Sequence, residues 1–258
     1  MRILKTYSNA ITVPNIYIAR TRVNALLAFV LLMLCCNLLL EIAANWNLIL
    51  NSLITTDKRA MLLLNFKGSA TTDSFWYGYS HMRAWIPLIL VTVGSVVYYH
   101  PGNWKEKLTL IIAIALLITV LDQLSSTVIK NLTARPRPSH DPSLCYLLHY
   151  VNGYHGGRYG FVSGHATNIV GITTVLCYIF RNRFIRLTLC LFAAMMCYSR
   201  IYLGVHFPGD IICGALLGYG VATLMLRTLG RKIHVYSTCC CPGLIIIFFT
   251  GTLLYLLF

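Results

Sequence analysis

Residues 187–226 read LTLCLFAAMMCYSRIYLGVHFPGDIICGALLGYGVATLML, which is two apolar runs around a short polar turn. The runs cover residues 187–198 and 211–226, and the turn between them carries Ser199, Arg200, His206 and Asp210. Charged side chains in or beside membrane-length apolar runs are unfavourable, so their presence there indicates a function. We therefore expect two membrane helices joined by a turn that holds chemically active residues.

The rest of the chain repeats this apolar pattern. Of its 258 residues, 57% are hydrophobic and only 11% are charged, which is unlike an ordinary soluble domain. About six runs approach the length that crosses a hydrocarbon core of roughly 30 Å. They cover residues 25–40, 84–99, 108–129, 166–180, 187–198 and 211–226. The sequence therefore predicts an all-α polytopic membrane helix bundle.

Residues 1–258 are expected to form a single membrane domain, because no repeat or long polar linker divides them. Residues 108–226 would carry the functional core. The first apolar run has no convincing cleavage site after it, so it is interpreted as a retained anchor. Residues 58–66 suggest a short interfacial helix. The last apolar stretch, residues 243–258, could span the membrane, lie in the interface or pack against the bundle.

The net charge of +14 comes from bases scattered over short loops between the apolar runs. This distribution favours membrane orientation and anionic phosphate over nucleic acid as its explanation. Bases in the N-terminal segment and near residues 105–107, 181–186 and 227–232 would lie on the cytoplasmic side. Residues 51–83 and 131–163 would then lie outside.

Three polar clusters stand at the ends of these runs. They are Lys130 with Arg137 and Pro138; Ser163, Gly164 and His165; and Arg200, His206 and Asp210. Because successive membrane helices alternate in direction, all three clusters should meet at the same outer face. Three cations and two histidines would then surround the position of an anionic head group.

Each residue type suits phosphoryl transfer, in which negative charge spreads over the equatorial oxygens of phosphorus. Lys130, Arg137 and Arg200 can stabilise that charge, and backbone amides at a helix start near Ser163 and Gly164 can add to them. A neutral His206 is a competent nucleophile if Asp210, one helical turn later, holds its tautomer. His165 is then the natural general acid.

The three clusters resemble the signature of the type 2 phosphatidic acid phosphatase superfamily, whose helical core is shared with vanadium haloperoxidases. The resemblance implies a metal-independent mechanism in which His206 becomes phosphorylated, with Asp210 as its partner and His165 as the acid. It also implies phosphate binding by Lys130, Arg137, Ser163, Gly164 and Arg200. One departure is visible, since Val162 stands where the family usually has proline.

Several further polar residues remain open to two readings. Asp122 could orient Lys130 or make a structural contact inside the bundle, and Arg158 could meet a second phosphate or a sugar or be a solvated loop base. The same two alternatives apply to Arg135, and we predict that both arginines are solvated loop bases. The histidines of the loop are expected to lie on its surface without a specific role; they are His140, His149 and His155. No metal site and no cofactor are expected, because the seven acidic residues form no paired arrangement.

The expected function is hydrolysis of a phosphate monoester or pyrophosphate on a membrane lipid. Undecaprenyl pyrophosphate and lipid A are the favoured substrates, and phosphatidylglycerol phosphate and phosphatidic acid are further candidates that the resemblance supplies. A lipid-to-lipid phosphotransferase, a haloperoxidase and an inactive membrane binding protein are the alternatives. The chain is expected in a bacterial inner membrane, with its site at the periplasmic or outer face and membrane lipids, not nucleic acid, as partners.

Overall fold

The computed structural model describes residues 14–229 and 242–258, and within these ranges it is helical and has no strand. The chain divides into two compact units, Met1–Thr55 and Thr56–Phe258. The first contains α1 (Pro14–Ala44) and the beginning of α2 (Trp46–Leu64). Its described side chains are exposed, as expected of an apolar helix that lipid would cover. A single domain over residues 1–258 stays a prediction.

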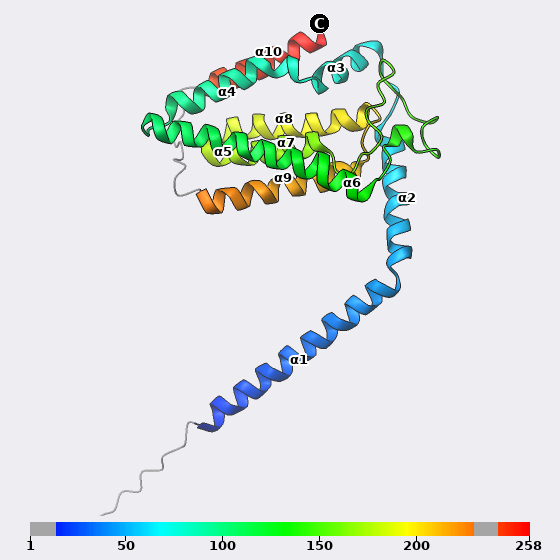
Figure 1. Ribbon diagram of the computed structural model, residues 1–258, viewed down its shortest axis with the longest axis vertical. Coiled ribbons are helices and arrows are strands. Elements are labelled where there is room, and N and C mark those ends of the chain that lie inside the picture. Colours follow the sequence, from blue (N-terminus) through cyan, green and yellow to red (C-terminus); the bar gives the residue numbers. More distant parts are fainter. Residues whose placement is uncertain (1–13, 230–241) are drawn as a thin grey trace, which may run out of the picture. The chain divides into compact units, whose positions relative to one another are not determined.

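The second unit is a bundle of helices (Figure 1). Several of them run side by side, with α7 packed against α5, α8 and α9. Its elements after α2 are α3 (Ala70–Ser80), the 3-10 turn Met82–Trp85, α4 (Ile86–Tyr99), α5 (Trp104–Asp122), the π-helix Gln123–Ile129, α6 (Lys130–Thr133), the 3-10 turn Pro138–His140, α7 (Gly164–Ile179), α8 (Arg183–Tyr202), α9 (Pro208–Leu229) and α10 (Pro242–Leu257).

The prediction of an all-helical membrane bundle is confirmed. Five segments of the described chain are long and apolar enough to cross a membrane: Leu26–Ala44, Met82–Tyr99, Trp104–Thr133, Arg183–Tyr202 and Pro208–Leu229. Each overlaps an expected run. The sixth expected run became α7, which has 16 residues and is shorter than the usual span. Half of its side chains are buried, because other helices surround it.

Glycines allow α7 and α9 to approach closely. A Cβ at Gly218 would collide with the backbone carbonyl of Thr167, and one at Gly214 would lie 2.8 Å from the carbonyl oxygen of Ser163. Small residues four apart are a common means of bringing membrane helices into contact. This contact places the start of α9 beside the start of α7, where two of the three clusters lie.

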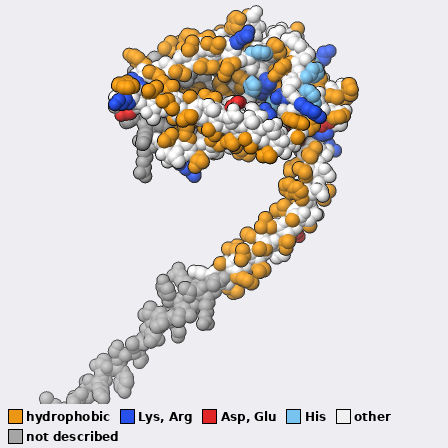
Figure 2. Space-filling view, viewed as in Figure 1, with side chains coloured by type: hydrophobic (Ala, Val, Ile, Leu, Met, Phe, Trp, Pro, Cys, Tyr) orange, Lys and Arg blue, Asp and Glu red, His pale blue; other side chains and the backbone are white. Residues whose placement is uncertain are grey.

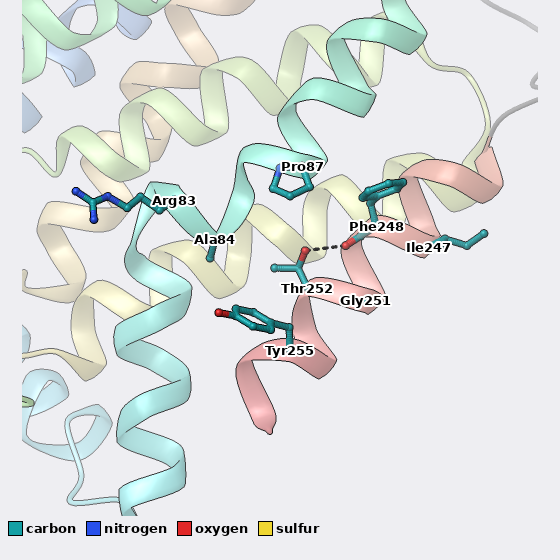
Figure 3. A pocket seen from close by; sticks show the side chains of 8 residues that line it. All are labelled: Arg83, Ala84, Pro87, Ile247, Phe248, Gly251, Thr252 and Tyr255. Atoms are coloured by element: carbon teal, nitrogen blue, oxygen red, sulfur yellow. Dashed lines mark hydrogen bonds between the residues drawn. The ribbon is translucent and has the colours of Figure 1, made fainter.

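The C-terminal helix α10 packs against α3, α4 and α8, which is one of the arrangements expected for residues 243–258. The ring of Phe249 stacks on Trp85 at a centroid distance of 6.0 Å and meets Phe192 edge-on at 6.2 Å. A cavity of about 440 Å³ opens between α4 and α10 (Figure 3). It is lined mainly by apolar residues, with Arg83 at one side.

The long segment between α6 and α7 is fixed to the helices beneath it. Asn65, at the end of α2, accepts a hydrogen bond from the backbone N–H of His149 and donates to the carbonyls of His149, Ile201 and Tyr202. Lys58 on α2 pairs with Asp141 at 2.8 Å. The segment is therefore a structured cover for this end of the bundle. Figure 2 shows lysine, arginine and histidine side chains gathered there, beside an apolar flank.

Candidate active site

The second and third clusters are joined through the backbone. Ser163 is the N-cap of α7, and its hydroxyl accepts a hydrogen bond from the Ala166 N–H at 3.4 Å. The Ser163 N–H donates to the carbonyl of Asp210 at 3.1 Å. Because the Ser163 amide is engaged in this way, the first-turn amides that remain suited to an anion are those of Gly164 and His165.

His206 lies in the turn between α8 and α9 and is 1% exposed. Its Nδ1 faces Oδ2 of Asp210 at 3.5 Å, and that oxygen also accepts the Phe207 N–H at 3.0 Å. Burial, followed by the charges of Arg137, Arg200 and Lys130, holds the pKa of His206 well below its ordinary value, although the Gly160 backbone acts in the opposite direction. The ring is therefore neutral at physiological pH, as a nucleophile must be.

Arg137 is held by backbone carbonyls. Its Nε donates to Tyr159 at 3.1 Å and one terminal nitrogen donates to Val205 at 3.3 Å. A Cβ at Gly156 would lie 2.7 Å from that same nitrogen, so the glycine makes room for the guanidinium. Two of the five donors are used for positioning, which leaves the others for a phosphate.

Arg200 is 3% exposed and lies at the end of α8. One terminal nitrogen contacts the hydroxyl of Ser80, and the other donates to the hydroxyl of Tyr154 at 3.2 Å. Its Nε is buried with no hydrogen-bond partner among the described residues. Neither Ser80 nor Tyr154 was singled out from the sequence, because contacts between residues so far apart in the chain leave no local pattern.

Lys130 and His165 complete the group. The Cβ position at Gly164 is 3.1 Å from the Ser126 hydroxyl and 4.0 Å from the Lys130 Nζ, so a side chain there would press against Ser126 and contact the lysine. His165, at the start of α7, is solvent-exposed and interacts electrostatically with Arg200, His206, Arg137 and Lys130. The structure therefore brings all eight candidate residues of the three clusters to one end of the bundle.

The carboxylates at this end contact other side chains. Asp141 pairs with Lys58, Asp73 contacts the His149 ring, and Arg135 pairs with both Asp57 and Asp210. In the described part of the chain, none of these ion pairs includes Lys130, Arg137 or Arg200. The three cluster cations therefore keep their charge available for an anionic ligand.

The preferred reading of Arg135 as a solvated loop base was wrong. Its side chain is 24% exposed and forms two ion pairs, with Asp210 at 2.8 Å and with Asp57 at 2.7 Å. Two features of the sequence could have drawn attention to it: Arg135 stands two residues before Arg137, and acidic residues such as Asp57 are rare in this chain. Neither feature indicates that Arg135 pairs with Asp57 and Asp210, because that pairing depends on the tertiary fold.

The predictions for Asp122, Arg158 and His149 differ in their outcome. Asp122 accepts a hydrogen bond from the Ser126 hydroxyl at 3.2 Å, which is a contact to the π-helix Gln123–Ile129 that follows it. Arg158 is exposed and lies over the ring of Tyr159. The prediction that His149 is a surface side chain without a specific role was wrong, because its Nε2 contacts the Asp73 carboxylate at 2.9 Å.

An aromatic rim borders Arg200. We use this name for Tyr77 and His81 of the α3 region together with Tyr154 of the covering segment. Tyr77 contacts the His81 ring at a centroid distance of 4.5 Å and the Tyr154 ring at 6.4 Å. Tyr77 and Tyr154 are partly exposed and His81 is exposed, so the rim presents ring surface beside the candidate phosphate site.

No group of three or more histidine, cysteine or acidic side chains suited to a metal ion occurs in the described ranges. The side chains of the three clusters offer two imidazoles and three cations. This combination supports attack on a phosphorus atom and stabilisation of the charge that develops on it.

Comparison with known proteins agrees with this geometry. Residues 108–234 match the PAP2 superfamily. A lipid A 4'-phosphatase of Porphyromonas gingivalis is 37% identical over 185 residues, which cover 72% of this chain and 75% of that protein. A lipid A 4'-phosphatase of Bacteroides thetaiotaomicron is 36% identical over 63% of this chain and 73% of its own length.

The fold also has a solved counterpart. The crystal structure of a transmembrane PAP2 type phosphatidylglycerolphosphate phosphatase from Bacillus subtilis aligns with a TM-score of 0.55 and 20% identity. The alignment covers 71% of this chain and 89% of that one. At this identity it supports the fold alone. The sequence relatives identify the chain as a membrane lipid phosphatase that belongs to the PAP2 superfamily.

Proposed function

We propose that the protein hydrolyses a phosphate monoester on a lipid A-type head group through a phosphohistidine intermediate on His206. The observation that carries this proposal is the buried His206, whose Nδ1 lies 3.5 Å from Oδ2 of Asp210, beside three cations that make no ion pair among the residues the structure describes. In a neutral imidazole with its proton on Nδ1, Asp210 would accept a hydrogen bond from that N–H, and the Nε2 lone pair would be free to attack.

The proposed reaction has two steps. In the first, Nε2 of His206 forms a bond to phosphorus, the bond from phosphorus to the lipid oxygen breaks, and His165 in its protonated form gives that oxygen a proton and becomes neutral. In the second, His165 takes a proton from water while the water oxygen attacks phosphorus, which releases inorganic phosphate and restores His206. Lys130, Arg137, Arg200 and the Gly164 amide would stabilise the equatorial oxygens in both steps.

Two observations favour lipid A among the candidate lipids. Both relatives described above are lipid A 4'-phosphatases. The aromatic rim also suits a head group built from sugar rings, because the C–H face of a pyranose packs well on an aromatic ring. A glycerol phosphate head group has no such face, so it would gain less from Tyr77 and Tyr154.

We further propose that residues 1–258 act as one membrane domain in a bacterial inner membrane, with the site on the periplasmic face. The external position of residues 131–163 follows from the charge of the loops on the opposite side. Some of those bases, such as Arg2 and Lys232, lie outside the described residues. Labelling of an introduced cysteine at exposed Arg158 by a membrane-impermeant reagent in spheroplasts tests the orientation, and labelling only after lysis would contradict it.

Phosphate release from purified protein in detergent with a chelator present tests the activity. The panel is lipid A, undecaprenyl pyrophosphate, phosphatidylglycerol phosphate and phosphatidic acid, each with wild type and His206→Ala. We expect chelator-resistant release that is fastest with lipid A and absent from the variant. Phosphate passed to a second lipid without release would indicate the phosphotransferase instead. Release by His206→Ala at the wild-type rate would refute the mechanism.

A further inference from the structure

We propose that Arg135 and Asp57 form a clamp that positions Asp210, and through it His206, for catalysis. The clamp comprises Arg135, between α6 and α7, and Asp57, on α2. It rests on the proposed function, since it assigns a role to the same site. Neither residue belongs to the three sequence clusters, and Asp57 lies outside the residues that match the family.

The guanidinium of Arg135 makes two separate ion pairs. One terminal nitrogen contacts Oδ1 of Asp210 at 2.8 Å, and the other contacts Oδ2 of Asp57 at 2.7 Å. Its plane is also placed against the ring of Phe207, with the guanidinium carbon 4.3 Å from the ring centroid. A planar fork held at both nitrogens and on one face has little freedom to rotate.

Asp57 fixes the same region from the other side. Its Oδ1 accepts the backbone N–H of Gly209 at 2.7 Å, in the first turn of α9. A carboxylate at a helix start satisfies an amide that has no partner within the helix and interacts favourably with the helix dipole. Asp57 therefore holds both Arg135 and the backbone next to Asp210.

The contacts fix the orientation of the Asp210 carboxylate towards His206. Its Oδ1 is taken by Arg135, and its Oδ2 accepts the Phe207 N–H at 3.0 Å and faces Nδ1 of His206. The carboxylate cannot turn away from the imidazole without losing two contacts to groups that are themselves held. The clamp would thus maintain the tautomer that leaves Nε2 of His206 free to attack.

This role differs from phosphate binding. Two donors of Arg135 are directed at carboxylates, whereas Arg137 and Arg200 make no ion pair in the described part of the chain. Loss of the clamp should therefore slow the chemical step without weakening substrate binding. A phosphate-binding role for Arg135 would instead raise KM.

The test uses Asp57→Asn, Arg135→Lys and Arg135→Gln, with lipid A in detergent micelles as the probe. Each should lower kcat by about 10- to 100-fold, as removal of an outer partner of an active-site residue commonly does, with KM unchanged. Arg135→Lys should retain more activity than Arg135→Gln because it keeps the charge. The double variant Asp57→Asn with Arg135→Gln should lose little more than either single change, since both break one unit.

Lys58→Ala is the matched control. It lies next to Asp57 on α2 and removes another ion pair of this end of the bundle, the contact with Asp141 at 2.8 Å. If α2 matters only because it docks on the covering segment, Lys58→Ala and Asp57→Asn should lower Tm and kcat alike. The proposal predicts that Lys58→Ala keeps kcat near the wild-type value.

Three outcomes would overturn the clamp: wild-type kcat in Asp57→Asn, a raised KM with unchanged kcat in Arg135→Gln, or equal losses in Asp57→Asn and Lys58→Ala. Failure of the proposed function looks different. In that case the wild-type protein itself would release no phosphate from lipid A, or His206→Ala would release it normally. The clamp variants are interpreted only against an active wild type and an inactive His206→Ala.

Discussion

The family-matched core, residues 108–234, and the flanking elements of the same unit differ in what they bring to the active-site end. The core supplies every candidate catalytic and phosphate-binding side chain of the three clusters. The flanks supply partners of those side chains or of the segment that covers them. Asp57 reaches Arg135, Ser80 reaches Arg200, and Asp73 reaches Tyr202 and His149.

This division indicates where chemistry and selectivity would be encoded. Changes in the core should alter the rate with every lipid phosphate, because phosphorus chemistry is common to all of them. Changes in the flanking α3 should alter which lipid is preferred, because Tyr77 and His81 border the site without joining the cation group. The comparison can be tested region by region.

The largest effect is expected from the core cation Arg200. Replacement by alanine removes a buried guanidinium that would face the charge of the transition state, and kcat/KM should fall by on the order of 10²- to 10³-fold for every lipid in the panel. Phosphate release assays measure this. A loss confined to one lipid would show that Arg200 acts in selectivity and would break the division.

The next effect is structural. Gly218→Val would force a side chain against the Thr167 carbonyl, and overpacking of this kind destabilises by up to about 3 kcal/mol. Thermal unfolding in detergent should show a clear decrease in Tm. Gly220→Val is the control, because no atom lies within 4 Å of its Cβ position. Equal Tm values for the two variants would contradict the close α7–α9 contact.

A smaller and selective effect is expected from α3. Tyr77→Leu removes an aromatic ring. Stacking on such a ring contributes about 0.5–1.5 kcal/mol, which corresponds to a loss of roughly 2- to 13-fold in kcat/KM. We expect the loss in kcat/KM for lipid A and little change for phosphatidic acid. Tyr98→Leu, which removes a ring on α4 that is 77% exposed, serves as the control. Equal losses for both lipids would argue against a sugar-binding rim.

The smallest signal is a titration. The pKa of His206 is lowered by burial and by three nearby cations, so its ring should stay neutral as the pH falls through the ordinary histidine range. Nitrogen NMR of histidine-labelled protein in detergent, with His206→Asn for assignment, measures this. Protonation at or above the ordinary histidine pKa would show that the ring is more solvated than the structure indicates.

Sequence reasoning located the helices and the three clusters because both signals are local. Apolar runs of membrane length identify spans, and their alternation brings Lys130, Ser163 and Arg200 to one face. One expected run formed α7, a helix of 16 residues that neighbouring helices enclose, and hydrophobicity alone does not reveal such enclosure. Sequence reasoning left the place of residues 243–258 open for the same reason.

The contacts that support the site could not be predicted. Arg135 and Asp57 are 78 positions apart, and Arg200 and Ser80 are 120 apart, so only the tertiary fold brings them together. For His149, the sequence shows only a histidine in a polar loop, and that pattern is the same whether the ring is solvated or contacts Asp73. The sequence therefore indicates which candidate residues come together, but not the contacts that hold them in place.

The most direct test of the central claim is trapping of the phosphoenzyme. Wild-type protein and His206→Ala are mixed with lipid A that carries labelled phosphate, denatured in alkali within one turnover, digested and analysed by mass spectrometry. The account predicts an alkali-stable, acid-labile phosphoryl group on the peptide that contains His206, absent from the variant. Label on any other residue, or equal labelling of His206→Ala, would contradict it.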